Sequence, residues 1–273
     1  MKRILILLMM ALAAFAPVSC QKHSRHKTTI KAKVPVPEAV DLGIVVKGKS
    51  VKWASFNLGA SRPEEVGDYY AWGEVETHYV SKNPFVWQVG KNGDRMLYDW
   101  AWYRYSTGSS CIVTKYCATR DEDFWGGDPK GPDGLTKLEP EDDAAHVLLG
   151  GNWRMPDREE FFALCELREL AKDANSDYTW EDWATVQDQN GDDVHGLRIT
   201  RKSTGATLFF PTTGIRMGDE LYRPNEVGAY WYSTLREAVS YLADSAKIWE
   251  EGVDKDSSTS RAFAHPIRPV YVE

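Results

Sequence analysis

The densest group of potential metal ligands in the chain is a run of acids around one proline. Calcium takes six to eight oxygen ligands, which four acids and nearby carbonyl groups can supply. The same acids precede a predicted helix, where negative charge complements the positive end of the helix dipole without any ion. Calcium binding and dipole complementation both stay open, and we predict no other cofactor. The candidate metal ligands are Glu139, Glu141, Asp142 and Asp143.

Aromatic side chains gather in two segments, YDWAWYRY at 98–105 and AYWYS at 229–233. Tryptophan and tyrosine combine a large apolar surface with a polar group, which suits both protein cores and sugar-stacking platforms. In a strand, side chains alternate between faces, so one face of the first segment is expected in the core. The candidate ligand-binding residues are Trp100, Trp102, Tyr103, Tyr230 and Tyr232.

Catalytic motifs of fixed spacing are absent from the sequence. It contains neither Gly-x-Ser-x-Gly nor His-Glu-x-x-His, and its histidines are scattered. A pair of acids for glycoside hydrolysis meets only in space, so spacing does not exclude one. We therefore predict a protein that is not an enzyme, with an unrecognised hydrolase as an alternative.

Two predicted helices, 141–149 and 157–171, lie between blocks of short strands. The second begins with Asp157 followed three residues later by Glu160, which is the spacing of a capping box. We expect Trp153 to pack in the core and Arg154 to pair with a carboxylate that holds the helix in place. The candidate structural residues are Trp153, Arg154, Asp157 and Glu160.

The predicted strands are short and separated by turns. A loop rich in glycine and proline covers 119–137, and turns are expected at 91–94 and 188–193. The sequence of the second turn resembles a calcium-binding loop of the EF-hand type. It lacks the downstream glutamate that binds the ion in such a loop, so a plain turn is favoured. Strands around two helices predict an α+β fold. The predicted strands are 50–56, 67–73, 98–105, 112–117, 197–200, 207–211, 229–233, 245–249 and 267–272.

The first 20 residues resemble an export signal that ends in a cysteine. Two basic residues precede an apolar run at 4–15, which is too short to span a bilayer of about 30 Å. Small residues then lead to Cys20, as in the lipobox of bacterial lipoproteins, where the cysteine is acylated. We predict lipidation of Cys20, as by palmitate; cleavage after Ala16 with plain secretion, or a retained segment, are the alternatives.

Charge divides the chain into a basic tether and an acidic domain. Residues 1–37 hold seven of the 33 Lys and Arg side chains and none of the 40 Asp and Glu, so 38–273 carry a net charge of −14. Such a domain repels nucleic acid, and we predict no nucleic-acid partner. The segment 21–37 is predicted as a tether that either lies on anionic headgroups or is simply solvated.

Three cysteines remain after Cys20, namely Cys111, Cys117 and Cys165. Export to an oxidising compartment permits a disulfide, although three thiols cannot all pair. One of them should therefore be free, or all should be reduced. No Cys or His pair has the spacing of a zinc finger, so zinc is not expected.

Several phrases resemble one known family. They are VDLG at 40–43, VKWASFNLGA at 51–60, GDYYAWGE at 67–74, LEPEDDAA at 138–145, GGNWRMPDREE at 150–160 and RPV at 268–270. They are similar to the Fibrobacter succinogenes major paralogous domain family of exported Bacteroidetes lipoproteins, from 38 to 273. The segment before and into the second helix also resembles formylglycine-generating-enzyme-like domains. Phe56 stands where many relatives carry cysteine.

This resemblance implies a C-type-lectin-like fold, with two helices packed on a twisted antiparallel sheet with long loops. It implies little chemistry, because the copper-binding cysteines of the enzyme have no counterpart after Cys165. We predict a lipid-anchored protein of the cell envelope, at the outer membrane, that binds a glycan or a protein without catalysis. A structural or assembly component of the envelope or of a surface appendage is the alternative outside the enzyme class.

Overall fold

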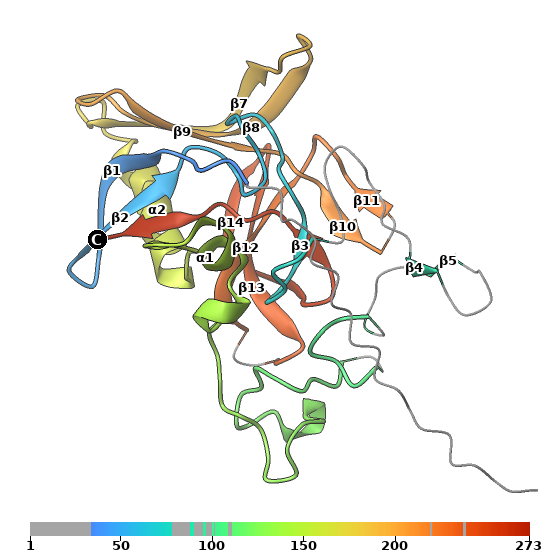
Figure 1. Cartoon of the computed structure of the whole chain (residues 1–273). Coiled ribbons are helices and arrows are strands. Elements are labelled where there is room, and N and C mark those ends of the chain that lie inside the picture. The colour runs from blue at the N-terminus through green and yellow to red at the C-terminus, as the bar shows by residue number, and fades with distance from the viewer. Residues whose placement is uncertain are drawn as a thin grey trace, which may run out of the picture. The chain divides into compact units, whose positions relative to one another are not determined.

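The computed structural model describes residues 34–77, 88–89, 95–96, 100, 102–108, 111–218, 220–236 and 239–273. These residues belong to one compact unit, Lys33–Glu273. The described part has two α-helices, α1 (Ala144–Leu149) and α2 (Arg158–Leu170), and is otherwise mostly antiparallel sheet (Figure 1). The predicted mixture of helix and antiparallel strand is confirmed, with strand dominating.

Four sheets carry most of the described regular structure. The first, in the order β1-β2-β16-β6, consists of β1 (Ala39–Val46), β2 (Lys49–Ala54), β16 (Val270–Val272) and β6 (Trp153–Arg154). The second consists of β11 (Glu220–Tyr222), β10 (Ile215–Met217), β15 (Ala264–His265) and β3 (Tyr70–Ala71). The third consists of β12 (Gly228–Leu235), β13 (Leu242–Trp249) and β14 (Gly252–Ser260). The fourth consists of β7 (Tyr178–Gln187), β8 (Asp193–Arg201) and β9 (Ala206–Pro211).

Smaller elements complete the described structure. One further pair joins β4 (Gln88–Val89) to β5 (Arg95–Met96). Two single turns of 3₁₀ helix are η1 (Glu122–Phe124) and η2 (Pro140–Asp142). The rest of 111–143 is loop with isolated bridges, which agrees with the loop predicted for 119–137 from its glycine and proline content.

Helix α2 lies at the centre of one of two hydrophobic clusters. Its apolar stripe includes Phe161, Leu164 and Leu167, all buried. The Phe161 ring meets Trp53 of β2 edge-on at 5.6 Å and lies 5.2 Å from Tyr232 of β12. Figure 1 shows the helix behind β1 and β2. Burying this stripe against several sheets holds the start of α2 in place relative to β2 and β12.

Strand β12 is buried on both faces and joins the two clusters. Tyr230 and Tyr232 point into the cluster that contains α2. Trp231 between them points into the other cluster, beside Trp72, and its indole N–H donates to the Tyr70 carbonyl at 2.8 Å. Alternation along a strand puts neighbouring side chains on opposite faces, so both faces of this aromatic run are core.

Two arginines are fully buried without a carboxylate partner in the described structure. Arg268 donates to the Asn57 side chain and to the carbonyls of Ala54 and Phe209, at 2.7 to 3.0 Å. Arg261 donates to three carbonyls and lies over the ring of Trp72 at 4.8 Å. Buried charge is tolerated here because each guanidinium is satisfied by hydrogen bonds.

Three expected elements differ from the structure. The segment 112–117 forms no strand; Val113 makes isolated bridges to Ser106 and Trp125 instead. The helix expected at 141–149 divides into η2 and α1, because the Asp143 backbone is extended and its side chain caps α1. The strand expected at 98–105 is loop where it is described, and the turn at 91–94 lies outside the described residues.

Candidate functional site

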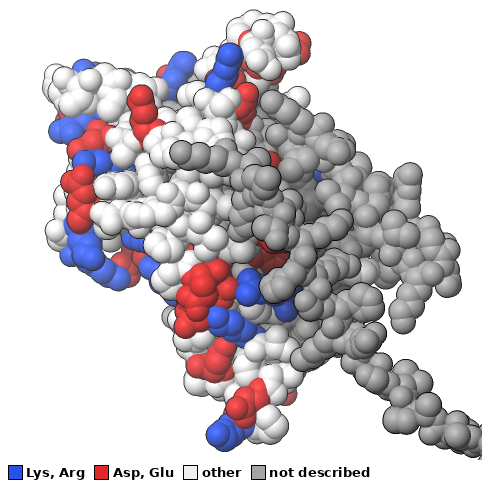
Figure 2. Space-filling model, viewed as in Figure 1, with Lys and Arg blue, Asp and Glu red and all other residues white. Residues whose placement is uncertain are grey.

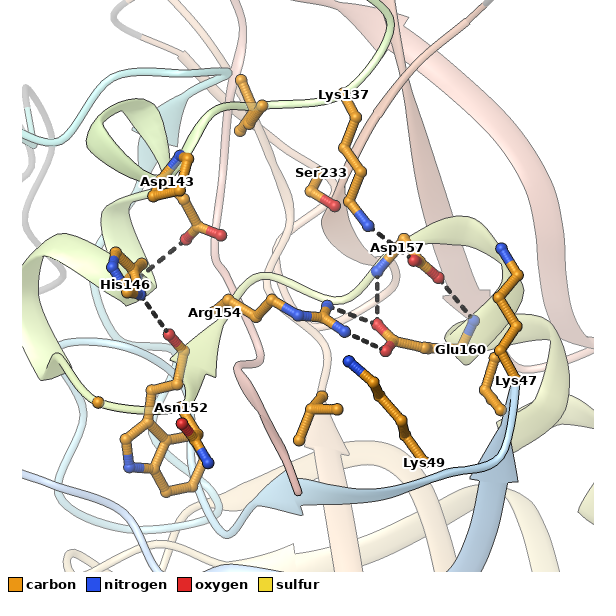
Figure 3. Close-up of a pocket in the computed structure, with 16 residues that line it drawn as sticks. Lys47, Lys49, Lys137, Asp143, His146, Asn152, Arg154, Asp157, Glu160 and Ser233 are labelled. Atoms are coloured by element: carbon orange, nitrogen blue, oxygen red, sulfur yellow. Dashed lines mark hydrogen bonds and ion pairs between the residues drawn. The ribbon is translucent and has the colours of Figure 1, made fainter.

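Two adjoining pockets surround the beginning of α2. The first has a volume of about 550 Å³ and the second about 520 Å³. Lys47, Lys137 and Asp157 line both, so the pockets form one continuous depression, which we call the α2 groove. The first pocket is drawn in Figure 3. Charged and hydroxyl groups line the groove together with apolar side chains such as Val46, Leu138 and Val272, so its wall is mixed.

Backbone pairing with the end of β12 brings distant segments together at the groove. The Leu138 N–H donates to the Ser233 carbonyl at 2.9 Å, and the Ser233 N–H donates to the Pro156 carbonyl at 2.8 Å. The loop at 136–138 and the start of α2 are therefore both fixed to the same strand. The turn that joins β1 to β2 carries Lys47, and β2 begins with Lys49 on the rim.

An ion pair inside a capping box makes the first pocket rigid. The Asp157 side chain accepts from the Glu160 N–H at 3.0 Å, and the Glu160 carboxylate accepts from the Asp157 N–H at 2.8 Å. The Arg154 guanidinium holds both Glu160 oxygens (Figure 3). Burial opposes the charge on Arg154, but the bonds to Glu160 raise its pKa. Trp153 is buried in β6 beside it, so the predicted structural roles are confirmed.

The three carboxylates of the first pocket are all bonded. Burial acts to raise the pKa of Asp157, but the Lys137 ammonium at 2.8 Å lowers it below its usual value. Asp143 accepts from the backbone N–H groups of Met155 and His146, although burial raises its pKa. Glu160 is held by Arg154. Each carboxylate of this pocket therefore has at least one hydrogen-bond or ion-pair partner.

Two lysines on the rim, Lys47 and Lys49, are exposed cations of the groove. Lys47 pairs with Glu159 at 2.7 Å, but both side chains are mostly exposed, at 73% and 57%. Such an exposed pair is weak and easily exchanged. Lys49 is exposed and has no ion pair or hydrogen bond with any described residue. In Figure 3 its ammonium points into the pocket, below the Arg154–Glu160 pair.

One buried hydroxyl of the groove lacks a partner. Ser233 is 2% exposed and lines the first pocket, yet its Oγ makes no hydrogen bond within the described structure. Figure 3 shows this oxygen turned toward the ends of Lys137 and Asp157. A buried hydroxyl without a partner is unfavourable by about 1–3 kcal/mol.

The second pocket contains a network of two arginines and two aspartates. Arg158 lies 2.7 Å from Asp256 and 3.9 Å from Asp244. Arg236 contacts the same two carboxylates, at 2.5 Å and 3.3 Å. Because these charges compensate one another, the network holds the wall of the pocket and leaves little free charge.

Basic groups outnumber acidic groups in the lining of the groove. The acidic lining residues are Asp143, Asp157, Glu159, Glu160 and Asp244. The basic ones are Lys47, Lys49, Arg120, Lys137, Arg154, Arg158 and Arg236. Figure 2 shows both signs interspersed along the left edge of the drawn face. A local excess of positive charge is unusual in a domain whose net charge is −14.

The predicted aromatic ligand site is corrected in part. Tyr103, Tyr230 and Tyr232 are buried in the two clusters, at 3% exposed or less, and are unavailable to stack on a sugar. Trp100 and Trp102 are half-buried and stay candidates. Trp102 lines a separate pocket of about 350 Å³, and the Trp100 ring packs edge-on against Tyr103 at 5.3 Å.

The four predicted metal ligands have other partners or lie apart. Lys115 contacts both Glu139 and Asp142, and the Tyr116 hydroxyl donates to Asp142 at 2.6 Å. Asp143 caps α1 and Glu141 is exposed. Among the described residues, no group of three or more His, Cys, Asp or Glu is arranged to hold a metal ion. Asp143 lies at the start of α1, as the alternative of dipole complementation expects, whereas Asp142 is held by contacts that the sequence did not indicate. The loop at 188–193 is a plain turn, as expected, closed by Asp188.

The described cysteines are all free thiols. Cys117 and Cys165 are buried and Cys111 is partly exposed. Burial raises the pKa of Cys165 to about 12 and also raises that of Cys117, so neither is a reactive thiolate. Cys20, the predicted lipidation site, lies outside the described residues.

Sequence analysis did not single out the groove's lysines or Ser233. Lys49, Lys137 and Ser233 come from segments separated by more than 80 residues, and each is an ordinary surface or strand residue by its local sequence. The pairing of 136–138 with β12 brings Lys137 to Ser233, and the sheet that joins β2 to β6 through β16 adds Lys49. Local signals pointed to this place through the capping box and the neighbouring Trp153 and Arg154.

Comparison of the chain with protein-family models, with curated proteins and with solved structures finds no match. Within the described residues, none of the helices has the length and apolar character needed to cross a bilayer.

Proposed function

We propose that this protein is a lipid-anchored component of the cell envelope, at the outer membrane, whose domain at 38–273 binds a glycan or a protein without transforming it. The signal, the lipobox-like residues before Cys20 and the basic tether support the location. The two helices among antiparallel sheets, with the family phrases around them, support a C-type-lectin-like domain. That likeness concerns the fold and carries no activity with it.

The α2 groove is the observation that carries the binding role. It is a preformed depression of about 550 and 520 Å³ whose walls are held by ion pairs and backbone pairing. Its carboxylates are bonded to cations or backbone N–H groups, which gives them a part in holding the wall of the groove. A rigid polar depression with accessible cations on its rim suits recognition better than turnover.

Two measurements test this proposal. Fractionation of the producing cell, with mass spectrometry of the mature protein, should find an acylated Cys20 in the membrane fraction, and Cys20→Ala should release the chain from the membrane. A glycan array probed with detergent-solubilised protein, with and without a calcium chelator, should give a defined set of glycans.

Turnover of any bound glycan would contradict the non-catalytic role. Silence across the array, together with a stable complex of envelope subunits recovered after cross-linking, would favour the structural and assembly alternative instead. An unacylated Cys20 in the mature protein would contradict the anchor.

A further inference from the structure

We propose that the α2 groove binds an acidic oligosaccharide, whose anionic groups are received by the rim lysines and by the Ser233 hydroxyl. This inference rests on the proposed binding function and names the ligand class of the same site. Two unpartnered polar groups in the first pocket, the Lys49 ammonium and Ser233 Oγ, point to it. Both are donors toward an anion, although one is exposed and the other is buried.

Charge favours an anion at this place. The groove lining has seven Lys and Arg against five Asp and Glu. Asp256, which pairs with Arg158 and Arg236 next to the lining, reduces this excess to one, whereas the domain as a whole is strongly acidic. An acidic ligand is repelled by the rest of the domain and attracted where the sign reverses, so the field directs it to the groove. Affinity should therefore fall as salt screens this attraction.

The ligand can bind cations of the groove without disrupting the contacts that hold the fold together. Lys49 is available at once, since no described group competes for it. Lys47 can exchange its exposed contact with Glu159 for a ligand oxygen. Lys137 and Arg154 hold Asp157 and Glu160, and keep the pocket in shape while the rim lysines bind.

The position of the Ser233 hydroxyl indicates how deeply the ligand enters the pocket. Ser233 Oγ is enclosed, faces the pocket and is unsatisfied in the described structure. A carboxylate or sulfate oxygen placed beside it would accept its hydrogen bond. The hydroxyl thus turns from an unfavourable feature of the unliganded protein into a favourable contact of the complex.

The polar wall of the second pocket favours a sugar over an acidic peptide there, whereas the first pocket also has apolar lining residues. Protein and peptide ligands take most of their binding energy from apolar anchors buried in pockets. Leu235 is the one apolar residue in the lining of the second pocket, where Thr136 and Thr234 offer hydroxyl groups. Sugar hydroxyls can bond with such side chains along the length of the groove, while the acidic groups bind the lysines.

The test uses calorimetry on the detergent-solubilised mature protein. The probes are oligogalacturonate, oligoalginate and heparin oligosaccharides, each with its methyl-esterified or desulfated counterpart, and poly-glutamate. We expect at least one acidic oligosaccharide to bind about tenfold or more tightly than its neutralised counterpart, and more weakly at 300 mM salt than at 50 mM.

If the neutralised glycans bind as tightly as the acidic ones, the proposal of an acidic ligand is wrong. The proposed binding function would still stand. Preferential binding of poly-glutamate, or no binding to any acidic glycan, would also overturn the proposal of an acidic oligosaccharide. The glycan array, which contains neutral sugars, tests the proposed function separately.

Matched variants locate the site. Lys49→Ala should weaken the acidic ligand about tenfold, since it removes one charge-assisted contact, and Lys172→Ala, an exposed lysine on another surface, should not. Ser233→Ala should weaken binding without lowering the melting temperature, because it removes an unpaired buried hydroxyl.

Ser260→Ala removes another buried hydroxyl without a described partner, on β14 and outside the lining of the groove. It should leave binding unchanged. If Lys49→Ala and Ser233→Ala both bind the acidic ligand as tightly as the parent protein, the α2 groove is not the binding site. This would hold even if the protein binds acidic glycans.

Discussion

At the residue scale, the buried His265 couples stability to pH. Its ring packs 4.2 Å from Trp231, and Nε2 has no hydrogen-bond partner in the described structure. Burial lowers the pKa of His265 from 6.5 to about 3. As pH falls below about 6.5, the unfolded chain gains a proton that the folded chain does not, so stability is lost down to the folded pKa.

We expect this residue to lower the free energy of unfolding by up to about 1.4 kcal/mol per pH unit between pH 6 and 4. Urea denaturation at several pH values measures the slope. His265→Gln should flatten it, whereas His195→Gln, at a partly exposed position, should leave it nearly unchanged. Identical slopes in the parent and His265→Gln would show that the buried ring is not responsible.

Residue roles that depend on near neighbours could be predicted from the sequence. The capping box of Asp157 and Glu160 involves residues three apart, so its spacing alone indicates it. The pairing of Arg154 with a carboxylate was expected, but its identity as Glu160 required the structure. No local sequence pattern indicates a role for Lys49 or Ser233, because their place in the pocket depends on contacts with segments far away in the chain.

At the scale of elements, the start of α2 fixes the shape of the groove. Asp157 both caps the helix and holds Lys137. Asp157→Ala should lower the free energy of unfolding by about 1 kcal/mol, because the Glu160 N–H loses its acceptor. Asp157→Asn keeps an acceptor and should lose less. Equal losses in the two variants, measured by urea denaturation, would contradict the capping role.

The acid dependence of this cap has a definite sign. The folded pKa of Asp157 lies below its usual value of 3.8, so its contribution is present above about pH 4 and is lost as pH falls further. Lys137→Ala removes the cation that lowers this pKa and should make that part of the acid transition begin at higher pH.

Strands show where local patterns stop being informative. Segments 207–211 and 245–249 are apolar enough to be recognised, and they form parts of β9 and β13. Strand β14 is almost entirely polar, so its sequence carries no signal; pairing with β13 alone makes it a strand. The segment 112–117 has strand-like residues but lacks a continuous partner, and pairing decides against it.

At the scale of the whole molecule, β12 explains why the aromatic prediction failed in part. Aromatic density on an exposed strand indicates a binding platform, but this strand is enclosed between two clusters. Sequence alone cannot distinguish a strand with one solvated face from one with both faces buried. Tyr230 and Tyr232 therefore support the fold, and the binding that we propose involves charged groups around α2.

The thiols give a test of the described structure as a whole. Because Cys117 and Cys165 are buried and unpaired, maleimide should label Cys111 in the native protein, and these two only after unfolding. Reductant should leave the melting temperature unchanged. An intramolecular disulfide found by mass spectrometry of the unreduced protein, or rapid labelling of Cys165 in native conditions, would contradict this packing.

If the chain is exported, as we propose, the place of β16 orders the late steps of its folding. Strands β2 and β6, a hundred residues apart, are hydrogen-bonded through β16, which pairs with both and carries Val272 on the wall of the groove. A chain that emerges with its N-terminus first can pair β2 with β1 at once, but the other edge of β2 stays unpaired until β16 follows. Until then this edge is open to pairing with other chains, and covering it would be a task for chaperones.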